Sequence, residues 1–208
     1  MSTQVRIGII TLLMLFVTPL WAAFDEGIEY KTVSPRVNNQ IDEGKTEVVE
    51  LFWYGCPHCF AFEPVLQKWL AHKPKDVNFV RIPAVFNPTW SLHARAYYTA
   101  EVLGVLDKTH EALFDAMHIK HEKMANADEL ASFFEKYGVK KDTFLETFNS
   151  FAVDAKVRRA IDLSKRYGIE GVPSMIVNGK YRTSGSLAGG HEGMLKVVDY
   201  LIKKEAKK

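Results

Sequence analysis

The chain has very few cysteines: among 208 residues there are two, at positions 56 and 59. This scarcity excludes a scaffold held together by disulfides. A bridge between Cys56 and Cys59 would close a loop too short to remove much entropy from the unfolded chain, so stability is a poor reason for the pair. The pair is better explained as a switch that cycles between dithiol and disulfide.

Other features that the sequence lacks exclude further classes of protein. Beyond the N-terminal segment, no apolar run is long enough to span a bilayer. The single Asn-x-Ser/Thr triplet, at Asn87, has Pro88 in its middle and cannot accept a glycan. The formal net charge is +2 and becomes +1 without Arg6, so no strong field points to nucleic acid. Internal repeats and low-complexity linkers are also missing.

Residues 1–22 are predicted to be a secretory signal peptide. Arg6 supplies a positive charge, residues 7–16 form a short apolar run, and cleavage is expected after Ala22 or Ala23. The alternative is an uncleaved membrane anchor, which the shortness of the run disfavours. Export would bring the dithiol to a compartment where disulfides persist, such as the bacterial periplasm.

The first half of the exported chain has a strand, helix, strand pattern. The nearly continuous apolar run over residues 47–53 predicts a strand buried on both faces. Pro57 suits the first position of a helix, which is expected to run to about residue 70 with a kink near Pro64. A second strand is predicted over residues 77–82.

The middle of the chain is helical and the end returns to β structure. Ser174–Val177 predicts a strand, Asn178-Gly179 a type I′ turn into residues 180–182, and residues 191–204 a last helix. The Lys-rich C-terminal end is expected to be a solvated tail. The helices predicted between the two halves cover residues 90–103, 106–118, 127–137, 141–149 and 152–167.

Cys-x-x-Cys between a strand and a helix is typical of a thioredoxin-like redox motif. We therefore expect an α/β protein with a thioredoxin fold interrupted by an inserted all-helical domain. The thioredoxin-like domain would be discontinuous, comprising residues 23–88 and 168–208, and the helical insertion would comprise residues 89–167.

The motif Cys56-Pro57-His58-Cys59 predicts different roles for its two sulfurs. Cys56 would face the free N–H groups and the positive end of the helix, which favour thiolate, and His58 would add a further donor or charge. Cys59 lies three residues on and would be the more buried, resolving thiol. Stabilising the Cys56 thiolate stabilises the reduced form, so the disulfide is expected to be donated to other proteins.

Metal and haem sites are the main alternatives for a cysteine pair. A structural zinc site needs two more ligands, and the remaining histidines are scattered. His118 and His121 share a helical face in the sequence pattern but are better explained as solvated residues. Phe60 occupies the position after Cys59 where haem attachment needs histidine. We expect no metal and no cofactor other than the cysteine pair.

The run FWYGCPHC over residues 52–59, the triplet Gly171-Val172-Pro173 and the helical insertion between them resemble the DsbA-type thiol:disulfide oxidoreductases of the bacterial periplasm. The resemblance covers essentially the whole exported chain. It implies oxidation of cysteine pairs in newly exported proteins. It also implies reoxidation by a quinone-linked inner-membrane partner of the DsbB type.

The resemblance also assigns residues outside the motif. Pro173 matches the family's cis-proline facing the disulfide, which would leave the backbone of Val172 free to pair with an extended client segment. Glu50 matches the family's buried acid beneath the disulfide, and it could relay the proton of Cys59. A solvent-facing Glu50 at a strand edge is the alternative. Arg81 stands where some relatives carry a base near that acid, although a solvated arginine fits equally well.

Three functions remain in competition on the sequence alone. The first is a dithiol oxidase acting on unfolded or reduced exported proteins, which we expect to be a monomer in the periplasm and not to bind nucleic acid. The second is a disulfide isomerase or reductase of the same compartment. The third is a peptide-binding chaperone without enzymatic activity, which would keep its function after loss of both cysteines.

Overall fold

The structure is a computed structural model in which residues 24–38 and 44–206 are described. It contains a five-stranded mixed sheet in the order β1-β5-β4-β2-β3. The predicted signal peptide, residues 1–22, lies outside the described residues. The strands are β1 (Lys31–Thr32), β2 (Thr46–Phe52), β3 (Val77–Pro83), β4 (Ser174–Val177) and β5 (Tyr181–Ser184).

The described part of the chain also contains seven helices. They agree with the predicted helices to within a few residues at each end, because their apolar spacing and their glycine breaks are clear in the sequence. They are α1 (Pro57–His72), α2 (Pro88–Val102), α3 (Leu106–His118), α4 (Ala127–Glu135), α5 (Lys141–Phe148), α6 (Phe151–Arg166) and α7 (His191–Ala206).

The central strand, β2, carries the active-site motif at its end. All of its residues are buried, as the apolar run predicts. It pairs in parallel with β3 and antiparallel with β4, so the strand, helix, strand unit expected from the sequence is present. Residues of β2 alternate between the two faces of the sheet, which places Val48 in one core and Val49 in the other.

The turn between β4 and β5 is of the predicted kind. Asn178 and Gly179 both have positive φ, 51° and 60°, as a type I′ turn requires. Glycine is needed at position 179 for a second reason, because a Cβ there would meet the Val37 carbonyl oxygen at 1.9 Å. The edge strand β1, which pairs antiparallel with β5, escaped prediction because two residues carry no periodic pattern.

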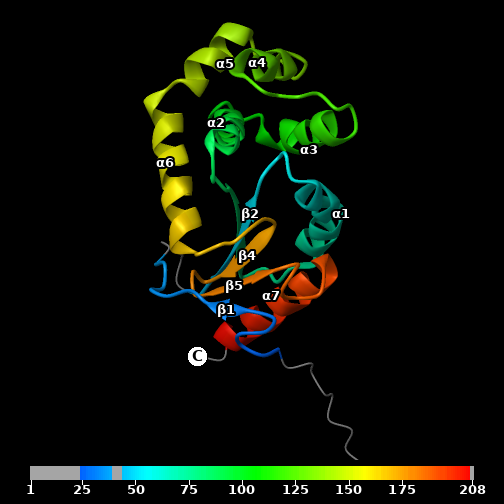
Figure 1. Cartoon of the computed structure of the whole chain (residues 1–208), viewed down its shortest axis with the longest axis vertical. Coiled ribbons are helices and arrows are strands. Elements are labelled where there is room, and N and C mark those ends of the chain that lie inside the picture. The colour runs from blue at the N-terminus through cyan, green and yellow to red at the C-terminus, as the bar shows by residue number, and fades with distance from the viewer. Residues whose placement is uncertain (1–23, 39–43, 207–208) are drawn as a thin grey trace, which may run out of the picture.

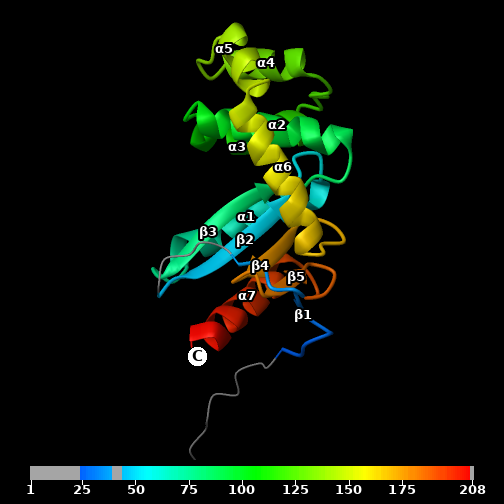
Figure 2. The same ribbon diagram turned by 90° about the vertical axis from the view of Figure 1, so that its left-hand side faces the viewer.

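Helices cover both faces of the sheet. One core packs α1 and α7 against β2 and β4, with Phe62 and Leu201 among its buried side chains. The other core packs the opposite face against the inserted helices, with Phe52 and Phe114 among its buried side chains. In Figures 1 and 2, α6 descends from α5 to the sheet on the side opposite α1 and α7.

Helices α2 to α6 follow one another between β3 and β4 and gather at one end of the molecule (Figure 1). The division into residues 89–167 and residues 23–88 with 168–208 stays a prediction, because one of the two cores joins the sheet to these helices. In the described ranges, none of the helices has the length and apolar character needed to cross a membrane.

Candidate active site

The two cysteines lie at the junction of β2 and α1. Cys56 is the residue before the first turn of α1, and Pro57 occupies the first helical position, where its missing N–H costs nothing. Both cysteines are free thiols in the structure. Cys56 is 9% exposed and Cys59 is 0% exposed, so the two sulfurs have the unequal access that the sequence predicts.

The thiol of Cys56 is made acidic by its surroundings. Its pKa falls from an ordinary 9.0 to about 6, chiefly because the Cys59 thiol donates a hydrogen bond to it. Burial opposes this shift, but the backbone N–H groups of Cys59 and His58 and then the charge of His58 add to it. In the dithiol state the Cys56 Sγ lies 3.5 Å from the carbonyl oxygen of Val172.

The thiol of Cys59 is shifted in the opposite direction. Burial raises its pKa far above the ordinary value, and the hydrogen bond to Cys56 and the nearby negative charges raise it further. The surroundings of Cys56 therefore favour its anion, whereas those of Cys59 favour the protonated thiol. The first turn of α1 therefore separates a thiolate from a thiol.

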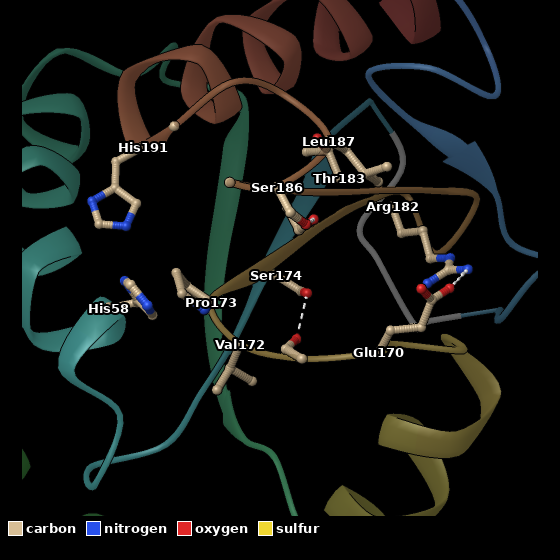
Figure 3. A pocket seen from close by; sticks show the side chains of 14 residues that line it. His58, Glu170, Val172, Pro173, Ser174, Arg182, Thr183, Ser186, Leu187 and His191 are labelled. Carbon is tan, nitrogen blue, oxygen red and sulfur yellow. Dashed lines mark hydrogen bonds and ion pairs between the residues drawn. The ribbon is translucent and has the colours of Figure 1, made fainter.

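His58 and Pro57 are exposed at the rim of the site. His58 lines a cavity of about 450 Å³ that extends between the cis-proline loop and the loop before α7 (Figure 3). His191 faces His58 across the mouth of this cavity, and its pKa is lowered by burial and then by the charge of His58. At the far end, Arg182 pairs with Glu170 at 2.8 Å.

The loop before β4 forms one wall of this cavity. The Val172-Pro173 peptide bond is cis, as the resemblance implies, and Ser34-Pro35 is a second cis bond that the sequence analysis did not anticipate. Ser174 Oγ donates a 2.7 Å hydrogen bond to the Gly171 carbonyl and holds this loop closed (Figure 3). Pro173 is buried and Val172 is half-buried.

Beneath the cysteines lies a buried charged cluster. Glu50 on β2 is fully buried, and desolvation raises its pKa to about 8 although the Arg81 charge opposes this. Arg81 Nε lies 3.0 Å from Glu50 Oε2 and Arg81 Nη2 lies 3.1 Å from Glu63 Oε2. Glu50 Oε1 is buried without a hydrogen-bond partner. The solvent-facing alternatives for Glu50 and Arg81 are therefore wrong.

The family relationship is decided by comparison with known proteins. A model of the DSBA-like thioredoxin domain matches residues 81–192. The thiol:disulfide interchange protein DsbA of Pseudomonas aeruginosa is 47% identical over 182 residues, covering 88% of this chain and 86% of that protein. The chain belongs to the DsbA family.

Other DsbA proteins are similar in sequence and structure. The DsbA of Pseudomonas syringae pv. tomato is 49% identical over 162 residues, covering 78% of this chain and 76% of that protein. The crystal structure of Pseudomonas aeruginosa DsbA has a TM-score of 0.83 at 47% identity and covers 89% of this chain and 97% of its own. The crystal structure of DsbA from Xylella fastidiosa has a TM-score of 0.81 at 38% identity, with 86% and 96% covered.

These findings establish the activity. The chain is a thiol:disulfide oxidoreductase that promotes oxidative folding of exported proteins, and its fold is the α/β thioredoxin-like fold with inserted helices. As a DsbA protein it acts through its own cysteine pair without an external cofactor. Among the described residues no group of three or more potential metal ligands comes together.

Several residues of this DsbA site were missed or misread in the sequence. Glu63 lies one helical turn after Cys59 on the same face of α1, a signal that could have found it. His110 was grouped with the scattered histidines, yet its Nδ1 lies 2.8 Å from the Tyr54 hydroxyl and its Nε2 3.4 Å from Glu63 Oε1. No sequence pattern links α3 to the cluster, so only the fold could reveal this contact.

The segment just before the motif is held by two more histidines of the inserted helices. Trp53 stacks on Trp90, and its indole N–H donates to His93 Nδ1 at 2.9 Å. His118 Nε2 donates to the Tyr54 carbonyl at 2.7 Å. The expected common face of His118 and His121 is wrong, because α3 ends at His118 and His121 has a φ of 57°.

Proposed function

We propose that Cys56 is the sulfur that clients attack and that Cys59 is the buried resolving sulfur. A client thiolate attacks Cys56 Sγ of the oxidised protein, the bond between the two cysteines breaks, and a mixed disulfide forms. A second client thiolate then attacks the client sulfur of that mixed disulfide. The client gains a disulfide, the protein accepts two electrons, and Cys56 leaves as a thiolate.

The opposite acidities of the two thiols carry this assignment. A pKa of about 6 makes the Cys56 thiolate a good leaving group near neutral pH and stabilises the reduced protein relative to the oxidised one. Cys59 leaves as an anion in the first step, and burial makes that anion unstable until it receives a proton. The site thus favours donation of the disulfide and needs a proton donor beneath it.

Glu50 is the residue that we assign to that proton transfer. At neutral pH a carboxyl with a pKa of about 8 holds its proton, and its Oε1 has no other partner. Glu50 would donate this proton to Cys59 as the disulfide opens and take it back when the disulfide re-forms. His58 and Pro57 would act at the rim, where the His58 N–H and ring stabilise the Cys56 thiolate.

Clients would bind along the cis-proline loop. The backbone of Val172, next to Pro173, lies beside Cys56, and the cavity of about 450 Å³ continues from it. A client strand pairing with Val172 would replace the contact between the Cys56 thiol and the Val172 carbonyl. Its cysteine would then lie opposite Cys56.

The setting of this reaction is also part of the proposal. The protein would work as a monomer in the periplasm after removal of residues 1–22. A quinone-linked membrane partner of the DsbB type would reoxidise the reduced pair, since the reaction consumes the disulfide. These assignments rest on family membership and on the predicted signal peptide.

Oxidation of a reduced, unfolded substrate by the exported protein tests the proposal. We expect one equivalent of protein to transfer one disulfide and become the dithiol, as counted by thiol alkylation and mass spectrometry. An isomerase would instead accelerate refolding of a scrambled substrate without net loss of its own disulfide. A chaperone would act equally well after both cysteines were replaced, and either result would contradict the assignment.

A further inference from the structure

Arg81 is shared unequally by two buried carboxylates. Glu63 accepts hydrogen bonds from Arg81 Nη2 at both of its oxygens, at 3.1 Å and 3.5 Å, and from Gln67 Nε2 at 3.4 Å. Glu50 receives one contact, from Arg81 Nε, and its other oxygen has none. One guanidinium cannot compensate two buried anions, so the carboxylate with more donors keeps the charge and the other keeps a proton.

His110 adds a further donor to Glu63. Both side chains are 7% exposed, and Nε2 lies 3.4 Å from Glu63 Oε1. An ionised carboxylate can only accept, so Nε2 carries the hydrogen, and Nδ1 of a neutral ring accepts from the Tyr54 hydroxyl. Burial lowers the pKa of His110 and so favours the neutral ring. Burial also raises the pKa of Tyr54, so its phenol stays protonated.

These contacts fix which carboxyl is charged. We propose that His110 is a positioning residue that holds Glu63 ionised beside Arg81 and thereby keeps Glu50 protonated as the proton donor to Cys59. This inference rests on the proposed role of Glu50. His110, on α3, contacts neither cysteine. It acts through Glu63 on α1 and Arg81 on β3, and these reach Glu50 on β2.

The electrostatics of the cluster agree with this division. Burial alone would raise the pKa of Glu63, yet this pKa is lowered, because the hydrogen bond from His110 and the charge of Arg81 outweigh burial. The negative charge of Glu63 in turn raises the pKa of Glu50. The titratable and charged groups that interact with Glu50 or His110 are Cys59 and Glu63 on α1, Arg81 on β3, Tyr54 before α1, Tyr97 on α2, and Glu111 on α3.

The proton transfer can be followed in the reverse direction. A coloured aromatic thiol is attached to Cys56 as a mixed disulfide, and its release by Cys59 is timed by stopped-flow absorbance across pH. Cys59 attacks Cys56, the bond to the aromatic thiol breaks, the thiol leaves as a thiolate, and the Cys59 proton passes to ionised Glu50. The rate should therefore rise with pH through an inflection set by Glu50.

Replacing His110 by two amides of different reach isolates its role. His110→Asn can still accept from Tyr54 but is too short to donate to Glu63, whereas His110→Gln can reach Glu63. We expect His110→Asn to move the inflection downward by about one pH unit, because Glu63 then gives up its charge more readily and no longer raises the pKa of Glu50. His110→Gln should restore the inflection toward its original position.

A matched control comes from the same helix. His118 contacts the Tyr54 carbonyl but has no contact with Glu63, so His118→Asn should leave the inflection in place. If His110→Asn does not fold, as judged by its thermal unfolding, Glu63→Gln carries the same expected downward shift. An unmoved inflection in the folded His110→Asn protein, or in Glu63→Gln where that variant replaces it, would overturn the inference.

The Glu50→Gln background separates the two proposals. If His110→Asn shifts the inflection downward in the original protein, and Glu50→Gln removes the inflection so that His110→Asn has no further effect in that background, both proposals are supported. If Glu50→Gln removes the inflection but His110→Asn in the original protein leaves it unmoved, the role of His110 alone is wrong. If Glu50→Gln leaves the profile unchanged, the proposed role of Glu50 fails, and the inference about His110 fails with it.

Discussion

The two sides of the first turn of α1 present opposite environments to two identical side chains. On the side of Cys56 there are backbone N–H groups, the exposed ring of His58, the cis-proline loop and an open cavity. On the side of Cys59 there is close packing and the buried carboxyl groups of Glu50 and Glu63, both paired with Arg81. The pKa of the Cys56 thiol is lowered, and that of the Cys59 thiol is raised.

This difference shows how one helical turn can separate the sulfur that exchanges disulfides with clients from the sulfur that gains and loses a proton. The outer thiol is stabilised as an anion chiefly by the hydrogen bond from the Cys59 thiol, and then by backbone N–H groups at the helix start and by the charge of His58. The inner thiol is surrounded by low-dielectric packing. The Cys59 anion that forms when the disulfide opens is unstable there and must be protonated. Proton transfer to Cys59 would explain why a carboxyl is buried near it, since a buried ion pair contributes little to stability by itself.

The largest effects should follow from removing each sulfur in turn. Cys56→Ser should abolish disulfide transfer, because clients have no accessible sulfur to attack. Cys59→Ala has no disulfide of its own, so it is first joined through Cys56 to glutathione. A client with a single free thiolate then attacks Cys56 Sγ, glutathione leaves as a thiolate, and the mixed disulfide with the client accumulates because Cys59 cannot displace the client. Non-reducing electrophoresis with mass mapping of the joined cysteines measures both. Joining of clients through Cys59 in the Cys56→Ser protein would contradict the separation of roles.

The next largest effect should follow from loss of the inner carboxyl. Glu50→Gln keeps the size of the side chain and a hydrogen bond but cannot exchange the Cys59 proton. We expect release of an aromatic thiol from the Cys56 mixed disulfide to slow by about 100-fold, the low end of what positioned acids and bases contribute. Glu63→Gln is the comparison variant: it keeps Glu50 as the proton acceptor, so release should stay fast at pH values above its lowered inflection. Equal rates in Glu50→Gln and the original protein would exclude the relay.

Two substitutions of His58 sharpen the description of the outer side. His58→Ala removes the ring but keeps the backbone N–H, and His58→Pro removes both contributions to the Cys56 thiolate. We expect both variants to be less oxidising, with His58→Pro lower by roughly 30 mV, equivalent to about 1.4 kcal/mol. Equilibration with glutathione buffers measures the potentials. An unchanged potential in His58→Pro would contradict the proposed stabilisation of the Cys56 thiolate by His58.

The lowered pKa of Cys56 also predicts a pH dependence of the stability of the reduced protein. Folding lowers the pKa of Cys56 from an ordinary 9.0 to about 6, so the thiolate contributes stability in full above pH 9. That contribution declines as pH falls and is lost through about pH 6. Urea unfolding of the dithiol protein and of Cys56→Ser between these pH values should show a stability difference that shrinks toward acid. A constant difference would contradict the lowered pKa.

Local patterns allowed much of this architecture to be predicted. Asn178-Gly179 specifies its turn, Pro57 specifies a helix start, and the apolar run of β2 specifies a buried central strand. The motif also predicts the unequal burial of Cys56 and Cys59. These features depend on neighbours within a few positions along the chain, where backbone and packing preferences act directly.

The remainder of the site depends on contacts between distant segments. His110 lies 47 residues from Glu63 and 56 residues from Tyr54 in sequence, and a histidine on an amphipathic helix carries no sign of either partner. The pairing of Arg81 with Glu50 follows from the parallel register of β2 and β3, which sets the two residues opposite each other, whereas Glu63 reaches Arg81 from α1. Buried charges are satisfied by tertiary structure, and their partners therefore had to be found in the fold.

The surroundings of Cys56 are expected to favour the reduced protein, so that its disulfide is donated. Equilibrating the exported protein with glutathione buffers, and counting free thiols after acid quenching and alkylation, measures this most directly. We predict a potential clearly above the −270 mV or so of thioredoxin, each 30 mV representing about 1.4 kcal/mol in favour of the dithiol. A potential at or below that of thioredoxin would mean that the site stabilises the disulfide, contrary to the account.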